Sequence, residues 1–283
     1  FPHDFRRAII TLTFLGGLAS TVFIPMIATL FGSLGWRDGT LVLALLHAGL
    51  CLPLHATLLR NAPRPTRFAA LSSGSEDGPA HRAEKPGLGT LMRSPAFLLL
   101  ALFTVALMAV TTALPAHMIS LLRESGLPES WVIAIPASIG AIQVLGRLLL
   151  YFAEHRMDVH RANALIPCLV PLGLAALLLG GTHVAGALLF VTLYGLGNGM
   201  LTIVKGTAMA QYVSRDHVAS LNGALGLPQA AARALAPLAL GLLWSPSVGY
   251  RWGLWLLLAL CVAGVLALWQ AQWISLRRAS PAP

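Results

Sequence analysis

Acidic residues are scarce in this chain, and none of them lies inside its long apolar runs. Its 283 residues include ten Asp and Glu against nineteen Lys and Arg, which gives a net charge of +9. Charged residues make up 10% of the chain, hydrophobic residues make up 57%, and the mean hydropathy is +0.76. A single soluble core cannot bury so much apolar surface, so the composition argues against a soluble enzyme.

Cysteine is also rare, and its placement excludes two common structural uses. Cys51, Cys168 and Cys261 each fall inside an apolar run, far apart and without a CxxC pair, so neither a disulfide framework nor a zinc cluster is predicted. The nine His are scattered, and no HxxxH or His-carboxylate pair occurs within a run. We therefore predict no metal, no cofactor and no catalytic residue, and the chain is not expected to be an enzyme.

Long apolar runs are abundant, and there are eight of them. Each has at least twenty residues, and a helix needs about 20 residues to cross the hydrocarbon core of a bilayer. The sequence therefore predicts an all-α polytopic membrane protein with eight transmembrane helices. The runs cover residues 8–31, 39–59, 95–122, 131–153, 162–181, 184–205, 217–244 and 250–274.

The basic residues alternate between the two sides of these runs. Fifteen of the nineteen lie at the chain ends and beside every second boundary, three lie in the opposite loops, and Arg233 lies inside a run. The positive-inside rule then predicts that both termini and the longest loop are cytoplasmic. This distribution reflects membrane orientation and not a nucleic-acid-binding face, and the expected location is the bacterial inner membrane.

The longest loop divides the chain unevenly. It is rich in Pro, Gly, Ser and charge, as expected of a flexible linker. The predicted organisation is two helices in residues 1–59, a linker in 60–94, six helices in 95–276 and a tail in 277–283. Residues 23–46 and 235–260 share an internal Pro, a Gly-Trp-Arg or Gly-Tyr-Arg turn and a Leu-rich return helix, which suggests a repeat.

These features together resemble the major facilitator superfamily. The resemblance is carried by the order of the runs, the basic central loop, the GWR turn at residues 35–37 and the loop GRLLLYFAEHRMDVHR that begins at Gly146. It implies a twelve-helix transporter with two six-helix halves. The chain would correspond to helices five to twelve, so we expect a fragment that lacks the first four.

The same resemblance implies a charged gate after the fourth run. The family's cytoplasmic loop motif places an acid near basic residues, and Glu154 stands where the acid is expected, although the motif's second Gly is missing. Carboxylate and guanidinium pairs of this kind can latch one conformation and release in another, whereas the alternative is that the charges only anchor helix ends. The expected gating residues are Gly146, Arg147, Glu154, Arg156 and Arg161.

Polar residues recur at helical spacing inside several runs. Offsets of 4, 7, 8 and 11 residues place such groups on one side of a helix. His117 is included among the predicted substrate-binding residues because the resemblance implies that its helix lines a cavity. The alternative is that His117 is a hydrogen-bonded packing residue. The predicted substrate-binding residues are Asn222, Gln229 and Arg233 in the seventh run, Tyr194, Asn198, Thr202 and Lys205 in the sixth, Gln143 in the fourth and His117 in the third.

The sign of the intramembrane charge suggests the cargo. Arg233 is well inside a run that contains no acid, so a cavity lined by it would attract an anion. The prediction is a secondary active or facilitative transporter of a small organic anion such as a carboxylate, working by alternating access as a monomer in the lipid bilayer, with protons or a counter-ion as coupling partners. A drug or metabolite exporter and a non-transporting sensor or scaffold remain the alternatives.

Overall fold

Helices account for the regular structure of this chain, as the sequence predicts. The computed structural model describes residues 5–58, 60, 87–153 and 156–279. Within these ranges no strand occurs, which confirms the all-α fold class. The helices are α1 (Phe5–Leu58), α3 (Leu88–Met92), α4 (Pro95–Glu124), α5 (Glu129–Ala153), α6 (Val159–Leu165), the 3-10 turn η1 (Ile166–Cys168), α7 (Leu169–Gly180), α8 (Val184–Tyr212), α9 (Val218–Ala224), α10 (Gly226–Leu242) and α11 (Arg251–Ala279).

Seven helical segments of the described residues are long and apolar enough to cross a membrane. They correspond to seven of the eight expected runs, and together they indicate an integral membrane protein. The remaining run, residues 8–31, falls within α1, where many side chains lie outside the described part. The eighth span therefore stays a prediction.

Two expected single helices are instead interrupted. Residues 162–181 form α6, η1 and α7, because Pro167 and Pro171 cannot donate the backbone hydrogen bonds of a continuous helix. Residues 217–244 form α9 and α10, which meet at Leu225 between Gly223 and Gly226. Glycine lowers helix stability by about 1 kcal/mol relative to alanine, so this pair favours a break.

The chain divides into two compact units, which are Ala19–Lys85 and the combination of Phe1–Leu18 with Pro86–Pro283. In the smaller unit, α1 reverses direction at Gly35, which has a φ of 75° that favours glycine. A Cβ atom at Gly39 would lie 2.8 Å from Cε1 of Phe31, so a side chain there would disturb the contact beside the turn. The GWR turn predicted from the sequence is this reversal.

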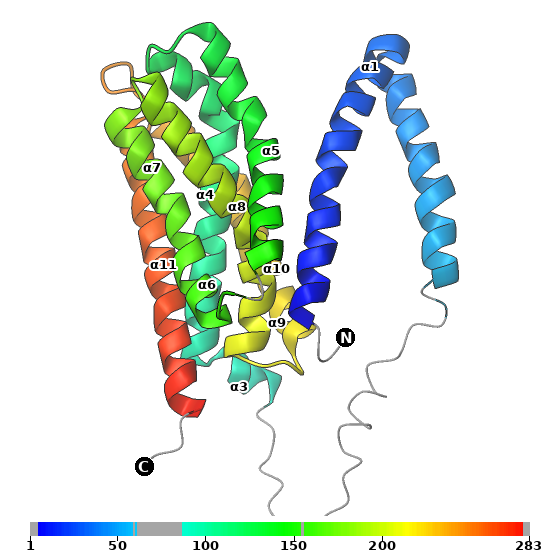
Figure 1. The fold of residues 1–283 in the computed structure, drawn as a ribbon, viewed down its shortest axis with the longest axis vertical. Helices are drawn as coiled ribbons and strands as arrows, with labels where there is room; N and C mark the ends of the chain where they lie inside the picture. Colours follow the sequence, from blue (N-terminus) through cyan, green and yellow to red (C-terminus); the bar gives the residue numbers. More distant parts are fainter. Residues whose placement is uncertain (1–4, 59, 61–86, 154–155, 280–283) are drawn as a thin grey trace, which may run out of the picture. The chain divides into compact units, whose positions relative to one another are not determined.

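The larger unit is a bundle in which the helices pack in a definite order. The most extensive contacts join α5 to α8, α8 to α7, α11 to α4 and α4 to α10, and α7 also packs on α11 (Figure 1). α4 also contacts α5 and α8, so the six helices form a bundle and not a single row. α10 and α5 are the least covered of them: 11% of the most apolar window of Val218–Leu242 and 22% of that of Glu129–Ala153 are buried, against 56% for Pro95–Glu124.

The start of α4 illustrates how the sequence sets helix ends. The hydroxyl of Ser94 accepts a hydrogen bond from the backbone N–H of Phe97 at 3.3 Å, and Pro95 follows at the first helical position. Both are helix-start signals, since the cap satisfies a free N–H and proline has none to lose. The preceding helix α3 lies in the segment expected to be linker, so the end of that segment is helical and contacts α4 and α9.

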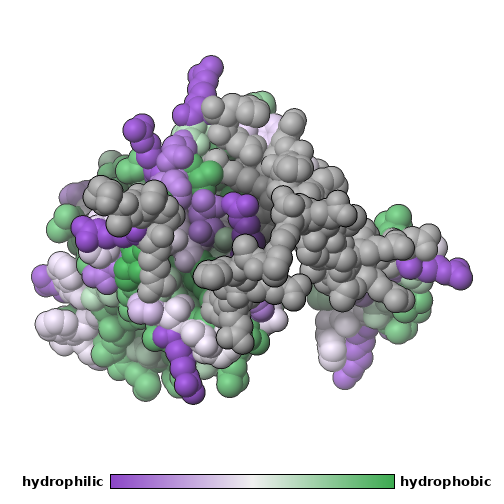
Figure 2. Space-filling model, turned by 90° about the horizontal axis from the view of Figure 1, so that it is seen from below, coloured by the Kyte–Doolittle hydropathy of each residue, from purple (hydrophilic) through white to green (hydrophobic). Residues whose placement is uncertain are grey.

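The surface of the bundle has the polarity that a bilayer requires. Leucines such as Leu179 and Leu242 are exposed on its flanks, with 85% and 76% of their surface accessible. Figure 2 shows hydrophilic side chains on the end of the bundle seen from below and hydrophobic ones around its rim. Such a distribution fits lipid contact along the flanks and water at the ends.

Candidate functional site

Helix α10 carries the most polar open face of the bundle. Gln229 is half-buried and Arg233 is exposed, and they lie one helical turn apart on α10. Asn222 is also exposed, but it belongs to α9, on the other side of the break at Leu225. The expected three-residue stripe is therefore continuous only from Gln229 to Arg233.

The Arg233 guanidinium is not neutralised by the described residues. Within that part of the chain it has neither a hydrogen bond nor an ion pair, and exposed leucines, including Leu235 and Leu238, follow it on the helix. A charged side chain at the centre of a membrane helix costs roughly 2.5 to 3.5 kcal/mol on insertion scales. Arg233 therefore needs water, an anion or another partner beside α10.

The four predicted residues of α8 do not share one environment. Tyr194 is fully buried beside Phe190, with ring centroids 5.5 Å apart, whereas Thr202 is exposed and Asn198 is half-buried. The Tyr194 hydroxyl has no hydrogen-bond partner among the described residues. Tyr194 consequently lies in the packed core of the bundle and not on its open side.

Lys205 occupies the end of that same row. It is half-buried and forms no hydrogen bond or ion pair with the described residues. Arg233, in contrast, is exposed on α10.

Helices α5 and α8 cross at very short range through glycines. A Cβ atom at Gly146 would lie 2.8 Å from the backbone oxygen of Leu196, and one at Gly199 would lie 2.8 Å from Cα of Gln143. Arg147 Nε donates a hydrogen bond to the Gly199 carbonyl at 3.3 Å. Gln143, Gly146 and Arg147 are thus held together at this crossing, where Arg147 binds a backbone oxygen.

The remaining predicted gating residues follow α5 in the chain. Arg156 lies in the loop after α5 and Arg161 in the first turn of α6, and both are exposed, whereas Glu154 lies outside the described residues. Asp158 accepts the backbone N–H groups of His160 and Arg161, at 3.1 and 3.3 Å, and so caps α6. A gating pair between Glu154 and an arginine stays a prediction.

His117 is held by two neighbouring helices. Its Nε2 lies 3.0 Å from the carbonyl oxygen of Pro237, and its Nδ1 lies 3.1 Å from the Tyr250 hydroxyl. Because a carbonyl only accepts, Nε2 carries the proton and Nδ1 of the neutral ring accepts from Tyr250. Both nitrogens are occupied, which favours the packing role for His117.

A second polar junction has no signal in the local sequence. Asn163 Nδ2 donates to the Tyr212 hydroxyl at 2.9 Å, and His160 Nδ1 lies 3.3 Å from the same oxygen. These groups are about fifty residues apart in the chain, so helical spacing cannot reveal them. These hydrogen bonds join α6 to the end of α8, so we assign these residues a role in stabilising the fold.

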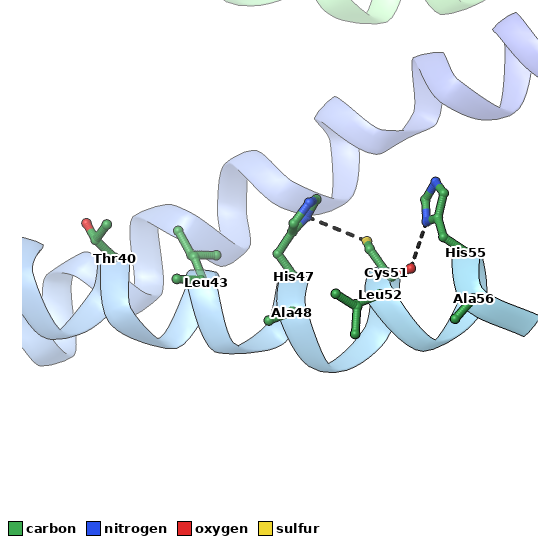
Figure 3. A pocket seen from close by; sticks show the side chains of 9 residues that line it. Thr40, Leu43, His47, Ala48, Cys51, Leu52, His55 and Ala56 are labelled. Atoms are coloured by element: carbon green, nitrogen blue, oxygen red, sulfur yellow. Dashed lines mark hydrogen bonds between the residues drawn. The ribbon is translucent and has the colours of Figure 1, made fainter.

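The sequence analysis also did not predict a contact between a histidine and a cysteine on α1. His47 Nδ1 and Cys51 Sγ lie 3.5 Å apart on α1 (Figure 3), at the i and i+4 spacing that brings side chains together on a helix. Among the described residues, no group of three or more His, Cys, Asp or Glu is positioned to hold a metal ion.

Comparison of the chain with protein-family models and with curated proteins found no match. The class of the protein therefore rests on its own composition and architecture. A bundle of long apolar helices with exposed hydrophobic flanks indicates a helical integral membrane protein.

Proposed function

We propose that this protein is a secondary active or facilitative transporter that carries a small organic anion across the bacterial inner membrane. In this proposal it has a major-facilitator-type fold, both termini are cytoplasmic, and a site near the middle of the membrane opens alternately to each side. The proposal rests on the environment of Arg233. It lies within a membrane-length segment, is exposed, and has no acidic partner among the described residues.

An anion is the partner that best satisfies this side chain. A guanidinium presents its N–H donors in a planar fork that matches a carboxylate, and such charge-assisted bonds are stronger than neutral ones. Gln229, one turn away, can add an amide donor to the same ligand. The apolar side chains around them keep the local dielectric low, which strengthens the attraction.

The architecture supplies a place for such a site. Within the larger unit, α5 and α10 bury least of their surface, so they are the helices available to face a cavity. The glycine crossing lets α5 and α8 pack closely against each other. Rocking of a rigid group around a fixed site is how alternating access is achieved in transporters with two repeats.

The test is uptake by vesicles that contain the protein. The full-length protein, purified into proteoliposomes, would be offered labelled monocarboxylates and dicarboxylates, with an organic cation and a neutral sugar for comparison. Loss of one charge-assisted hydrogen bond costs about 1.5 to 3 kcal/mol, so Arg233→Gln is expected to weaken anion affinity about 10- to 150-fold. Arg251→Gln is the matched control, since it removes an exposed arginine at the start of α11.

Two results would count against the proposal in different ways. Equal affinity of the wild type and Arg233→Gln for every transported anion would remove Arg233 from the binding site. Absence of any accumulation by the wild type, with the protein folded and inserted, would contradict transport itself and favour a sensor or scaffold.

A further inference from the structure

One face of α11 carries two tryptophans and an arginine near the C-terminal end of the helix (red in Figure 1). Trp269, Trp273 and Arg277 follow each other at intervals of four residues, which place side chains on the same side of a helix. All three are exposed. The two tryptophans line one open pocket together with apolar side chains such as Leu266. We call Trp269, Trp273 and Arg277 the Trp–Arg face of α11.

The guanidinium of Arg277 is held against an indole ring. Its Cζ atom lies 3.8 Å from the ring centre of Trp273, which is a cation–π contact. A guanidinium carries its N–H donors around its edge, so contact through its flat face leaves these donors available. Among the described residues Arg277 has neither a hydrogen bond nor an ion pair. Its donors are therefore open to a ligand outside the protein.

Contacts with α6 fix the direction of this face. Trp269 Nε1–H donates a hydrogen bond to the carbonyl oxygen of Ala164 at 3.0 Å. Gln272, three residues further along α11, donates from Nε2 to the carbonyl oxygen of His160 at 3.1 Å. These two bonds hold this end of α11 against α6, so the exposed side of α11 is set by tertiary contacts.

The spacing along α11 matches the polar region of a bilayer leaflet. Four residues of a helix rise about 6 Å, and the headgroup region on each side of the hydrocarbon core is about 5 to 7 Å thick. Tryptophan is enriched at the boundary between the two, because its ring is apolar and its N–H is polar. With Trp273 at the edge of the hydrocarbon, Arg277 lies at the level of the lipid phosphates.

The charge at this end of the chain has one sign. Arg277 and Arg278 are adjacent, and no Asp or Glu follows Asp216 in the sequence. The C-terminal end of a helix itself repels an anion, so the arginine must supply the attraction. This end is predicted to be cytoplasmic, and the cytoplasmic leaflet of a membrane carries anionic lipids. The charge of the face is complementary to such a lipid.

We propose that the Trp–Arg face binds one anionic phospholipid. The lipid phosphate accepts hydrogen bonds from Arg277, whose planar fork of donors matches two phosphate oxygens. The upper part of an acyl chain lies against Trp269 and Trp273, in the open pocket that they line. This binding requires neither a solute nor transport, so it stands or falls independently of the proposed function.

The experiment measures the quenching of tryptophan fluorescence by brominated lipids. The full-length protein would be reconstituted in phosphatidylcholine vesicles that contain increasing fractions of phosphatidylglycerol brominated in the upper acyl chain. A parallel series would contain phosphatidylcholine brominated at the same position. The fluorescence that Trp273→Phe removes is expected to be half-quenched at an about fivefold lower fraction of phosphatidylglycerol, which is the factor for one arginine near an anionic membrane surface.

Matched variants separate this site from the general attraction of a basic protein to anionic lipid. Arg277→Gln and Arg251→Gln each remove one exposed positive charge, from opposite ends of α11. Arg277→Gln is expected to reduce the preference to less than about twofold, whereas Arg251→Gln is expected to keep it. Trp252→Phe, which removes an exposed tryptophan at the start of α11, is also expected to keep it. A wild type without a preference, or equal losses in the two arginine variants, would overturn the proposal.

A second measurement does not depend on tryptophan fluorescence. Native mass spectrometry of the detergent-solubilised full-length protein would compare the binding of the first phosphatidylglycerol with that of the first phosphatidylcholine. The apparent Kd is expected to be about fivefold lower for phosphatidylglycerol in the wild type and in Arg251→Gln, but not in Arg277→Gln. Excess inorganic phosphate is expected not to displace the lipid, because it has no acyl chain to contact the tryptophans. Displacement by phosphate would indicate a site for free anions and overturn the assignment to a lipid.

Discussion

Replacing Gly199 by alanine tests the close contact between α5 and α8. The new Cβ atom would lie 2.8 Å from Cα and 2.9 Å from the carbonyl carbon of Gln143. These are backbone atoms, which cannot rotate away as a flexible side chain can, so the helices must separate. Overpacking of this kind lowers the free energy of unfolding by up to about 3 kcal/mol. The better helix propensity of alanine raises it by about 1 kcal/mol. The expected net loss is about 2 kcal/mol, or about 30-fold in the unfolding equilibrium constant.

The same substitution at Gly140 is the control. Gly140 also lies in the interior of a helix, on α5, but a Cβ atom there would have no neighbour within 4 Å. Gly140→Ala is therefore expected to be neutral or to stabilise by up to about 1 kcal/mol. Both free energies of unfolding would be measured by equilibrium denaturation in mixed micelles. Equal stability of the two variants would refute the close crossing of α5 and α8.

The same assay checks two hydrogen-bonded junctions. Tyr212→Phe leaves the buried Asn163 amide without one acceptor, so we expect a loss of about 1 to 3 kcal/mol. Tyr151→Phe, at a half-buried tyrosine on α5, is its control and is expected to change stability by less than about 0.5 kcal/mol; equal losses would contradict this role of Tyr212. Tyr250→Phe removes the hydroxyl bonded to His117 and is expected to cost about 1 kcal/mol, and an unchanged stability would show that this bond contributes nothing.

Which segments are helical could be predicted because the signals are local. Run length and hydropathy identified seven described segments of membrane length, and the Ser94 and Pro95 pair marks the start of α4. The interruptions were missed because Pro167 and the glycines around Leu225 lie inside otherwise apolar runs. Hydropathy averages over such residues, although their backbones interrupt the helical hydrogen bonds.

The candidate site was harder to predict, because helical periodicity fixes only the angle between residues on one helix. It grouped Tyr194 with Thr202, yet packing against Phe190 buries the first and leaves the second exposed. The sequence around His117 does not predict that Pro237 and Tyr250 bind its two ring nitrogens, because these partners are more than a hundred residues away in the chain. The position of a neighbouring helix decides such contacts.

The sequence by itself determined that this chain is a helical membrane protein, because the cost of placing backbone and charge in hydrocarbon depends mainly on local composition. It also singled out Arg233 as a charge without an acid in its own run. Only the tertiary structure showed that Arg233 stays exposed while Lys205 is half-buried. The reason is that the order in which helices pack decides which face of each one is covered, and that order depends on contacts between residues far apart in the chain.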